Sequence, residues 1–135
     1  MILLIDAIVL LDVIMKRQEF VKDSSVIWKL CETGKVKGYV SSLTIASIVD
    51  IMQKEMDPQK IEEVLSMLSM IFEFTDLCVS DIQQAARMQW NDYEDAIQSA
   101  TAQRIHADFI ITRNIKDFAK SKILTFTPVE LLARI

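Results

Sequence analysis

Apolar residues occur along this chain in short uninterrupted runs, separated by longer stretches in which they recur at helical spacing. The first run, Met1–Ile5, is apolar throughout and has the length of a strand. Continuous apolar runs are typical of strands covered on both faces, as in a parallel sheet. On this basis we predict five strands: Met1–Ile5, Lys37–Val40, Leu77–Val79, Asp108–Thr112 and Ile123–Phe126.

The stretches between these runs predict helices, because their apolar residues repeat every three or four positions. Gly34 suits the end of one helix and Pro58 the first turn of another. The predicted helical segments are Ala7–Arg17, Ser24–Thr33, Ser41–Glu55, a helix starting at Asp57, Ser80–Trp90, Tyr93–His106, Lys116–Lys120 and a terminal helix from Thr127.

Strands that alternate with helices indicate an α/β fold. We predict three layers, α/β/α, with a central parallel sheet of about five strands, and a single domain spanning residues 1–135. In the helix after Asp57, the residues Met67, Met70 and Phe74 widen the apolar face. A surface of this kind is a candidate contact for a homodimer or another protein.

Polar residues follow directly after two of the predicted strands. Asp6 follows the first strand, and Thr112, Arg113 and Asn114 end the fourth. Parallel sheets bind ligands beyond the carboxyl ends of their strands, where the strand order reverses. If the first and fourth strands are neighbours at that point, these side chains meet.

Three further acids accompany this pair of strand ends. Asp92 and Asp95 begin the helix at Tyr93, and Asp117 lies three residues after Asn114. Small residues at 96, 99, 100 and 102 would let this helix approach the sheet closely. Carboxylate oxygens are the ligands that Mg²⁺ and Mn²⁺ prefer. Asp6 and Asp92 also suit the simpler role of helix N-caps, and Asn114 that of a turn cap.

The combination resembles a PIN domain, the ribonuclease fold of VapC-type toxins. The similar segments run from Leu4 to Asp12, from Asp92 to Gln98 and from Ile111 to Phe118. The resemblance implies a five-stranded parallel sheet, an acidic site for Mg²⁺ or Mn²⁺, and endoribonuclease activity. It implies that Asp6, Asp95 and Asp117 are catalytic and bind metal, supported by Thr112, Asn114 and Asp92.

Two positions depart from the usual pattern of that family. Ile8 stands where an asparagine is usual, and Ser47 stands where a second acid is usual. Asp50, about one helical turn after Ser47, is either a substitute ligand or a solvated surface acid.

The leading hypothesis is therefore a metal-dependent endoribonuclease, the toxin of a type II toxin–antitoxin pair. Its partners would be RNA, a protein antitoxin and a second copy of itself. The alternative is a PIN-like binding module whose acids no longer hold metal. A dehalogenase-type phosphatase needs an acid where Ile8 stands, and the chain has no glycine-rich loop for a nucleotide.

Charge and cysteine usage narrow these hypotheses. The net charge of −4 argues against a broad basic face for nucleic acid. Arg113, Lys116 and Lys120 form a local basic group that would contact RNA phosphates or simply face solvent.

Cys31 and Cys78 have no partner at metal-ligand spacing, which suits a reducing, cytoplasmic compartment. No apolar segment is long enough for a membrane, and Met1 has the position of a mature start.

Overall fold

The computed structural model describes all 135 residues and contains one five-stranded parallel sheet. The strand order is β3-β2-β1-β4-β5. The strands are β1 (Ile2–Ile5), β2 (Lys37–Ser41), β3 (Glu73–Thr75), β4 (Phe109–Ile111) and β5 (Thr125–Phe126). The predicted parallel α/β sheet is confirmed.

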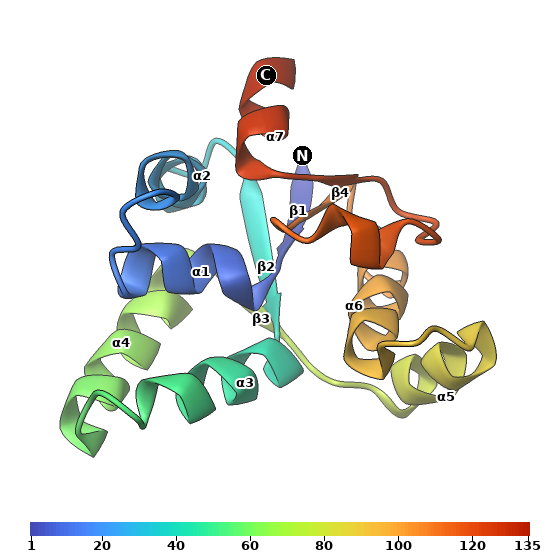
Figure 1. Ribbon diagram of the computed structural model, residues 1–135, viewed down its shortest axis with the longest axis horizontal. Helices are drawn as coiled ribbons and strands as arrows, with labels where there is room; N and C mark the ends of the chain where they lie inside the picture. The colour runs from blue at the N-terminus through green and yellow to red at the C-terminus, as the bar shows by residue number, and fades with distance from the viewer.

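Helices cover both faces of this sheet, as Figure 1 shows. On one side lie α1 (Ala7–Ile14), α2 (Val21–Glu32), α3 (Ser42–Met52) and α4 (Pro58–Ile71), with α7 (Pro128–Arg134) beside α2. On the other side lie α5 (Val79–Met88), α6 (Tyr93–Arg104) and the short 3₁₀ helix η1 (Ile115–Phe118). The arrangement is the predicted three-layer α/β/α fold. None of these helices combines the length and the apolar composition needed to cross a bilayer.

The two faces of the sheet form separate parts of the core, because successive strand residues point to opposite faces. Leu3 and Ile5 of β1 join the larger apolar cluster beneath α1 to α4. Leu4 joins the smaller cluster under α6 and η1, together with Ile110 and Phe118. All three β1 side chains are completely buried. This explains why the first predicted strand is apolar throughout.

The strand order reverses at β1, which pairs with β2 on one side and with β4 on the other. Leu4 is opposite Tyr39 of β2 and Ile110 of β4, and Ile5 is opposite Ile111. The backbone N–H of Asp6 continues this ladder by donating to the Ile111 carbonyl at 2.9 Å. Asp6 and the end of β4 therefore lie at the same edge of the sheet.

The predicted third strand is wrong. The strand is Glu73–Thr75, paired with Tyr39–Ser41 of β2, whereas Leu77 and Val79 are exposed and lead into α5. As β3 is an edge strand with only Thr75 buried, it has no apolar run by which the sequence could identify it. The apolar side chain of Phe74 consequently belongs to this strand and not to the face of α4.

The start of the helix after β3 also differs from the prediction. The N-cap residue is Cys78 and not Ser80, because the Asp81 side chain accepts a hydrogen bond from the Cys78 backbone N–H at 3.0 Å. Asp81 at the third helical position thus makes the reciprocal bond of a capping box, to the backbone N–H of the N-cap residue.

Candidate active site

Asp6 occupies the carboxyl end of β1 and performs two structural functions there. Its Oδ1 accepts from the Ala7 N–H at 2.9 Å, which makes it the N-cap of α1. Its Oδ2 accepts from the Thr112 hydroxyl at 2.7 Å, which joins the ends of β1 and β4. Burial raises the pKa of Asp6, while the bond from Thr112 acts in the opposite direction. This hydrogen bond to the Asp6 carboxylate is the contact through which Thr112 would support the site.

Asp95 lies in the first turn of α6, and its pKa is raised to about 7. Burial is the largest cause, followed by repulsion from the carboxylates of Asp92, Asp6 and Asp117. The small residues predicted to permit close packing do so, since every residue from Ala96 to Ala102 is buried. A carboxylate that raises the pKa of another carboxyl group by repulsion lies near that group. The fold therefore gathers the three predicted acids in one region.

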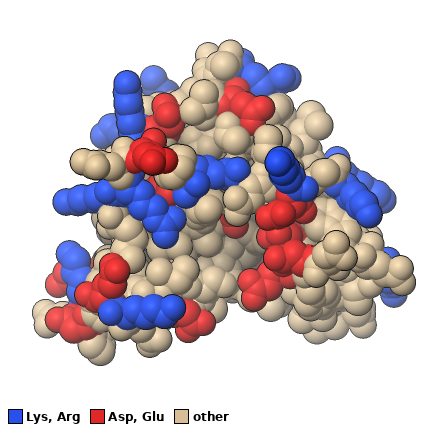
Figure 2. Space-filling view, viewed as in Figure 1, with Lys and Arg blue, Asp and Glu red and all other residues tan.

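Asp117 and Asp92 complete this acidic group from two exposed positions. Asp117 belongs to η1 and raises the pKa of both Asp6 and Asp95. Asp92 accepts from the Asp95 N–H at 3.1 Å, so it is the N-cap of α6, as its simpler interpretation stated. Figure 2 shows acidic side chains gathered along one side of a hollow, with basic side chains at one end of them.

The predicted positions for a second acid do not add a further carboxylate next to Asp6. Ser47 is half-buried on α3, and Asp50 is exposed one turn later. Asp50 is absent from the charges that raise the pKa of Asp6 and Asp95. Ile8, in place of the usual asparagine, packs against the larger core cluster.

A neutral polar group fills the space between α3 and α6 instead, and sequence reasoning missed it. Gln98 is 4% exposed, accepts from the Ser41 hydroxyl at 2.8 Å and donates to the Thr44 hydroxyl at 2.9 Å. It also favours the charged form of Asp6, although its full hydrogen bonds go to the two hydroxyls. One signal was available: Gln98 lies one turn after Asp95 on an otherwise small and apolar face.

A second missed feature is a buried ion pair beside the site. Asp12, completely buried on α1, receives two hydrogen bonds from Arg113, at 2.9 and 3.0 Å. Ser24 donates a further bond at 3.0 Å, and the guanidinium lies 3.5 Å over the ring of Phe20. Two of the Arg113 nitrogens donate to Asp12 and tie the loop between Thr112 and Asn114 to α1, while contact of Arg113 with RNA stays a prediction.

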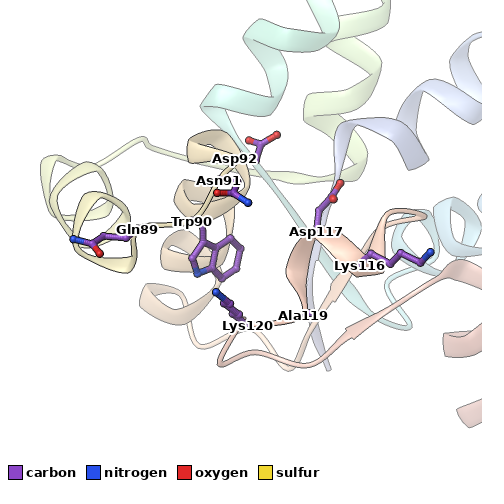
Figure 3. Close-up of a pocket in the computed structure, with 8 residues that line it drawn as sticks. All are labelled: Gln89, Trp90, Asn91, Asp92, Lys116, Asp117, Ala119 and Lys120. Atoms are coloured by element: carbon purple, nitrogen blue, oxygen red, sulfur yellow. The ribbon is translucent and has the colours of Figure 1, made fainter.

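Asn114 supports that loop through its backbone. Its N–H donates to the Thr112 hydroxyl oxygen at 3.0 Å, and its side chain makes no capping bond to η1. Lys116 and Lys120 are exposed, and neither has a carboxylate within ion-pair distance. Both line a cavity of about 230 Å³ next to Asp117, which Figure 3 shows together with Trp90 and Asn91.

The donor set fits a hard divalent cation with few protein ligands. No three side chains of His, Cys, Asp or Glu lie close enough to hold one ion together. Mg²⁺ is usually bound through one or two carboxylates and keeps several waters or phosphate oxygens. Asp6 with Asp95 or Asp117 would supply two carboxylates for such a site, and a bound cation would relieve the repulsion that raises the pKa of Asp95.

Replacing Asp95 by asparagine should stabilise the fold at neutral and higher pH. Because the folded pKa of about 7 exceeds the ordinary value of 3.8, the charged form opposes folding, and stability falls as pH rises between these values. Asp95→Asn should therefore unfold at higher urea than the wild type above about pH 7. The difference should vanish near about pH 4. The control Asp50→Asn should show no such dependence, and a less stable Asp95→Asn at pH 8 would contradict the account.

The Asp12–Arg113 pair has a matched control in the same chain. Arg104 likewise donates two hydrogen bonds to the buried carboxylate of Asp81, at 2.9 and 3.0 Å. Lysine cannot form that fork, so Arg113→Lys and Arg104→Lys should each lose about 2 kcal/mol of stability. Only Arg113→Lys should loosen the neighbouring Thr112 and raise the pKa of Asp6 further, measured by NMR titration of the carboxyl carbons. Equal Asp6 pKa values in both variants would show that the pair does not support the site.

Comparisons with known proteins were made against curated sequences, solved structures and family models. No curated protein sequence gives a significant match. Among solved structures, FitAcB from Neisseria gonorrhoeae has a TM-score of 0.72 at 17% identity, covering 96% of this chain and 99% of that chain. VapBC-1 from nontypeable Haemophilus influenzae has a TM-score of 0.73 at 12% identity, with 96% and 99% covered. A toxin–antitoxin complex from Klebsiella pneumoniae has 0.69 at 23%, with 93% and 96% covered.

These structural similarities concern the fold, because the identities are low. The family model described as the PIN domain matches residues 3–116 of the chain. That range includes Asp6, Asp95, Thr112 and Arg113, and it ends one residue before Asp117. The sequence match and the observed architecture agree, and the chain belongs to the PIN domain family.

Proposed function

We propose that this protein is a metal-dependent endoribonuclease that hydrolyses RNA phosphodiesters. The observation that supports it most is the group of mutually repelling carboxylates at the point where the strand order reverses, with the pKa of Asp95 raised to about 7. Carboxylates whose pKa values are shifted by burial and by one another are found most often at functional sites. Nucleases of the PIN family use divalent metals in general, which agrees with this chemistry.

Asp6 together with Asp95 or Asp117 would hold Mg²⁺ or Mn²⁺, which when bound would supply an activated water and stabilise charge on the phosphate. The chain itself fixes the geometry. Thr112 holds one oxygen of Asp6 in place, and the N-cap bond to Ala7 holds the other. Lys116 and Lys120, which carry no ion pair, would attract the phosphates that flank the scissile bond.

A role as the toxin of a type II toxin–antitoxin pair is part of the proposal. It is supported by the fold similarity to chains from VapBC-1, FitAcB and a toxin–antitoxin complex. The partner would be a protein antitoxin, and a second copy of this chain would form a homodimer. Met67 and Met70 lie three residues apart on α4 and are 41% and 85% exposed, and an exposed apolar surface of this kind supports a protein contact. Two free cysteines suit action in the cytoplasm.

A binding module without metal is the second candidate, and one observation favours it. The positions at which the family usually has its asparagine and its second acid hold Ile8 and Ser47, and Ile8 is packed against the core. The neutral Gln98 group stands where a further carboxylate would strengthen a metal site. In this version residues 1–135 keep the PIN fold but act through binding alone.

Cleavage and metal binding should separate the two candidates. The protein should cleave single-stranded RNA with Mn²⁺ and stop when EDTA is added. Asp6→Asn and Asp95→Asn should each reduce the cleavage rate by about a hundredfold or more and abolish Mn²⁺ binding in calorimetry. Asp50→Asn, which changes an exposed acid on α3, should retain both properties. No Mn²⁺ binding by the wild type at millimolar concentrations would exclude the nuclease.

A further inference from the structure

The cavity between the start of α6 and η1 combines side chains suited to a nucleotide. It has a volume of about 230 Å³ and is lined by Trp90, Asn91, Lys116, Asp117 and Lys120. Figure 3 shows the indole of Trp90 with Asn91 above it and Lys120 below, facing the segment that carries Asp117. Because Asp117 is also one of the site's acids, the cavity adjoins the candidate active site.

Four of the side chains that line this cavity have no partner within the chain, whereas Asp92, which also lines it, accepts from the Asp95 N–H. Neither the indole N–H of Trp90 nor the Asn91 amide makes a hydrogen bond, although hydrogen bonds of neighbouring side chains are numerous. Lys116 and Lys120 have no ion pair, although the chain has an excess of acids. The cavity therefore presents an aromatic ring, a free amide and two unpaired cations to solvent. All four groups are available to a ligand.

We infer that this cavity binds one unstacked nucleotide of single-stranded RNA next to the scissile phosphate. The inference rests on the proposed function and names the part of the substrate that this site recognises. Aromatic side chains stack on splayed bases, and an amide hydrogen-bonds to a base edge. Lys120 lies beside the indole, and Asp117 lies on the opposite side of the cavity. The ammonium group of Lys120 would contact the phosphate of the stacked nucleotide. The neighbouring phosphate of the strand would then lie near Asp117.

The opposing interpretation is that Trp90 only packs. Its ring meets Phe118 edge-on, with 6.1 Å between centroids, and it borders two small apolar clusters. Packing accounts for the edge that faces Phe118, but it does not explain Asn91 and the two lysines, which are exposed and serve no contact in the fold. Duplex RNA should be a poor ligand, since its bases are already stacked and paired.

The chain offers a direct spectroscopic test, because it has two tryptophans. Trp28 lies on α2 and packs against Phe72 at 5.2 Å in the larger core cluster, so Trp28→Phe leaves Trp90 as the single emitter. A single-stranded oligoribonucleotide added to this variant in EDTA should quench its fluorescence, and the same sequence as a duplex should not. In the reverse variant Trp90→Phe, where Trp28 remains, the emission should not change.

Affinity measurements that include the exposed positions 91 and 120 separate the effect on binding from an effect on folding. In EDTA, binding of the labelled single strand should weaken about tenfold in Trp90→Ala. Asn91→Ala and Lys120→Gln, both on the surface, should weaken it several-fold. Lys54→Gln, which changes an exposed lysine in the turn after α3, should not. Thermal melting of each variant checks that it remains folded.

The outcomes distinguish this inference from the proposed nuclease. Wild-type cleavage of RNA with no Trp90 quenching and no effect of Asn91 or Lys120 would overturn the nucleotide site and leave the nuclease intact. Binding of an acidic protein segment in place of RNA, with RNA failing to quench, would also overturn it. Quenching and weakened binding in metal-free buffer would support the site even if cleavage were absent.

Discussion

The pairing of β1 with strands on both of its sides is the constraint on which this molecule depends. Its register places Ile5 opposite Ile111, so the chain leaves β1 at Asp6 and leaves β4 at Thr112 at the same depth. The Thr112 hydroxyl then bonds to the Asp6 carboxylate at 2.7 Å. A slip of one residue would turn Leu3, Leu4 and Ile5 to the wrong faces, so the buried core itself fixes where the acids meet.

That convergence has an electrostatic cost, which the surrounding structure offsets only in part. Asp6 and Asp95 both have raised pKa values, and their neighbours contribute repulsion. The guanidinium of Arg113 donates to Asp12 and stacks over Phe20, and it forms no ion pair with Asp6, Asp95 or Asp117. Gln98 adds a neutral dipole. The site keeps an uncompensated negative charge, which is the condition that a cation requires.

The sequence predicted the fold well where elements are buried and less well at the edges. The apolar run Met1–Ile5 indicates a central strand, because a strand covered on both faces has apolar residues at successive positions. Glu73–Thr75 is exposed along most of its length, so its pairing with β2 is a tertiary effect that no local pattern records. Helix starts followed capping chemistry at Asp57 and Thr127, while Cys78 relies on Asp81 instead.

The candidate site was predictable where its residues adjoin buried elements that the sequence identifies. Asp6, Asp95 and Asp117 could be proposed because they follow strands or open helices that a parallel sheet brings together. The ion pair of Asp12 with Arg113 joins residues 101 positions apart, and periodicity alone makes Asp12 look like an interruption of an apolar run. The sequence predicted Trp90 only as the last residue of a helix. Its cavity forms because η1 packs against α6, and no local pattern indicates that contact.

The central claim is that the acids at the carboxyl ends of β1 and β4 form a divalent metal site. A crystal soaked in Mn²⁺ tests it most directly through the anomalous signal of the ion. We expect an anomalous peak within bonding distance of carboxylate oxygens of Asp6 and of Asp95 or Asp117, with waters as the remaining ligands. A well-occupied Mn²⁺ elsewhere on the surface, with no peak among these three residues, would contradict it.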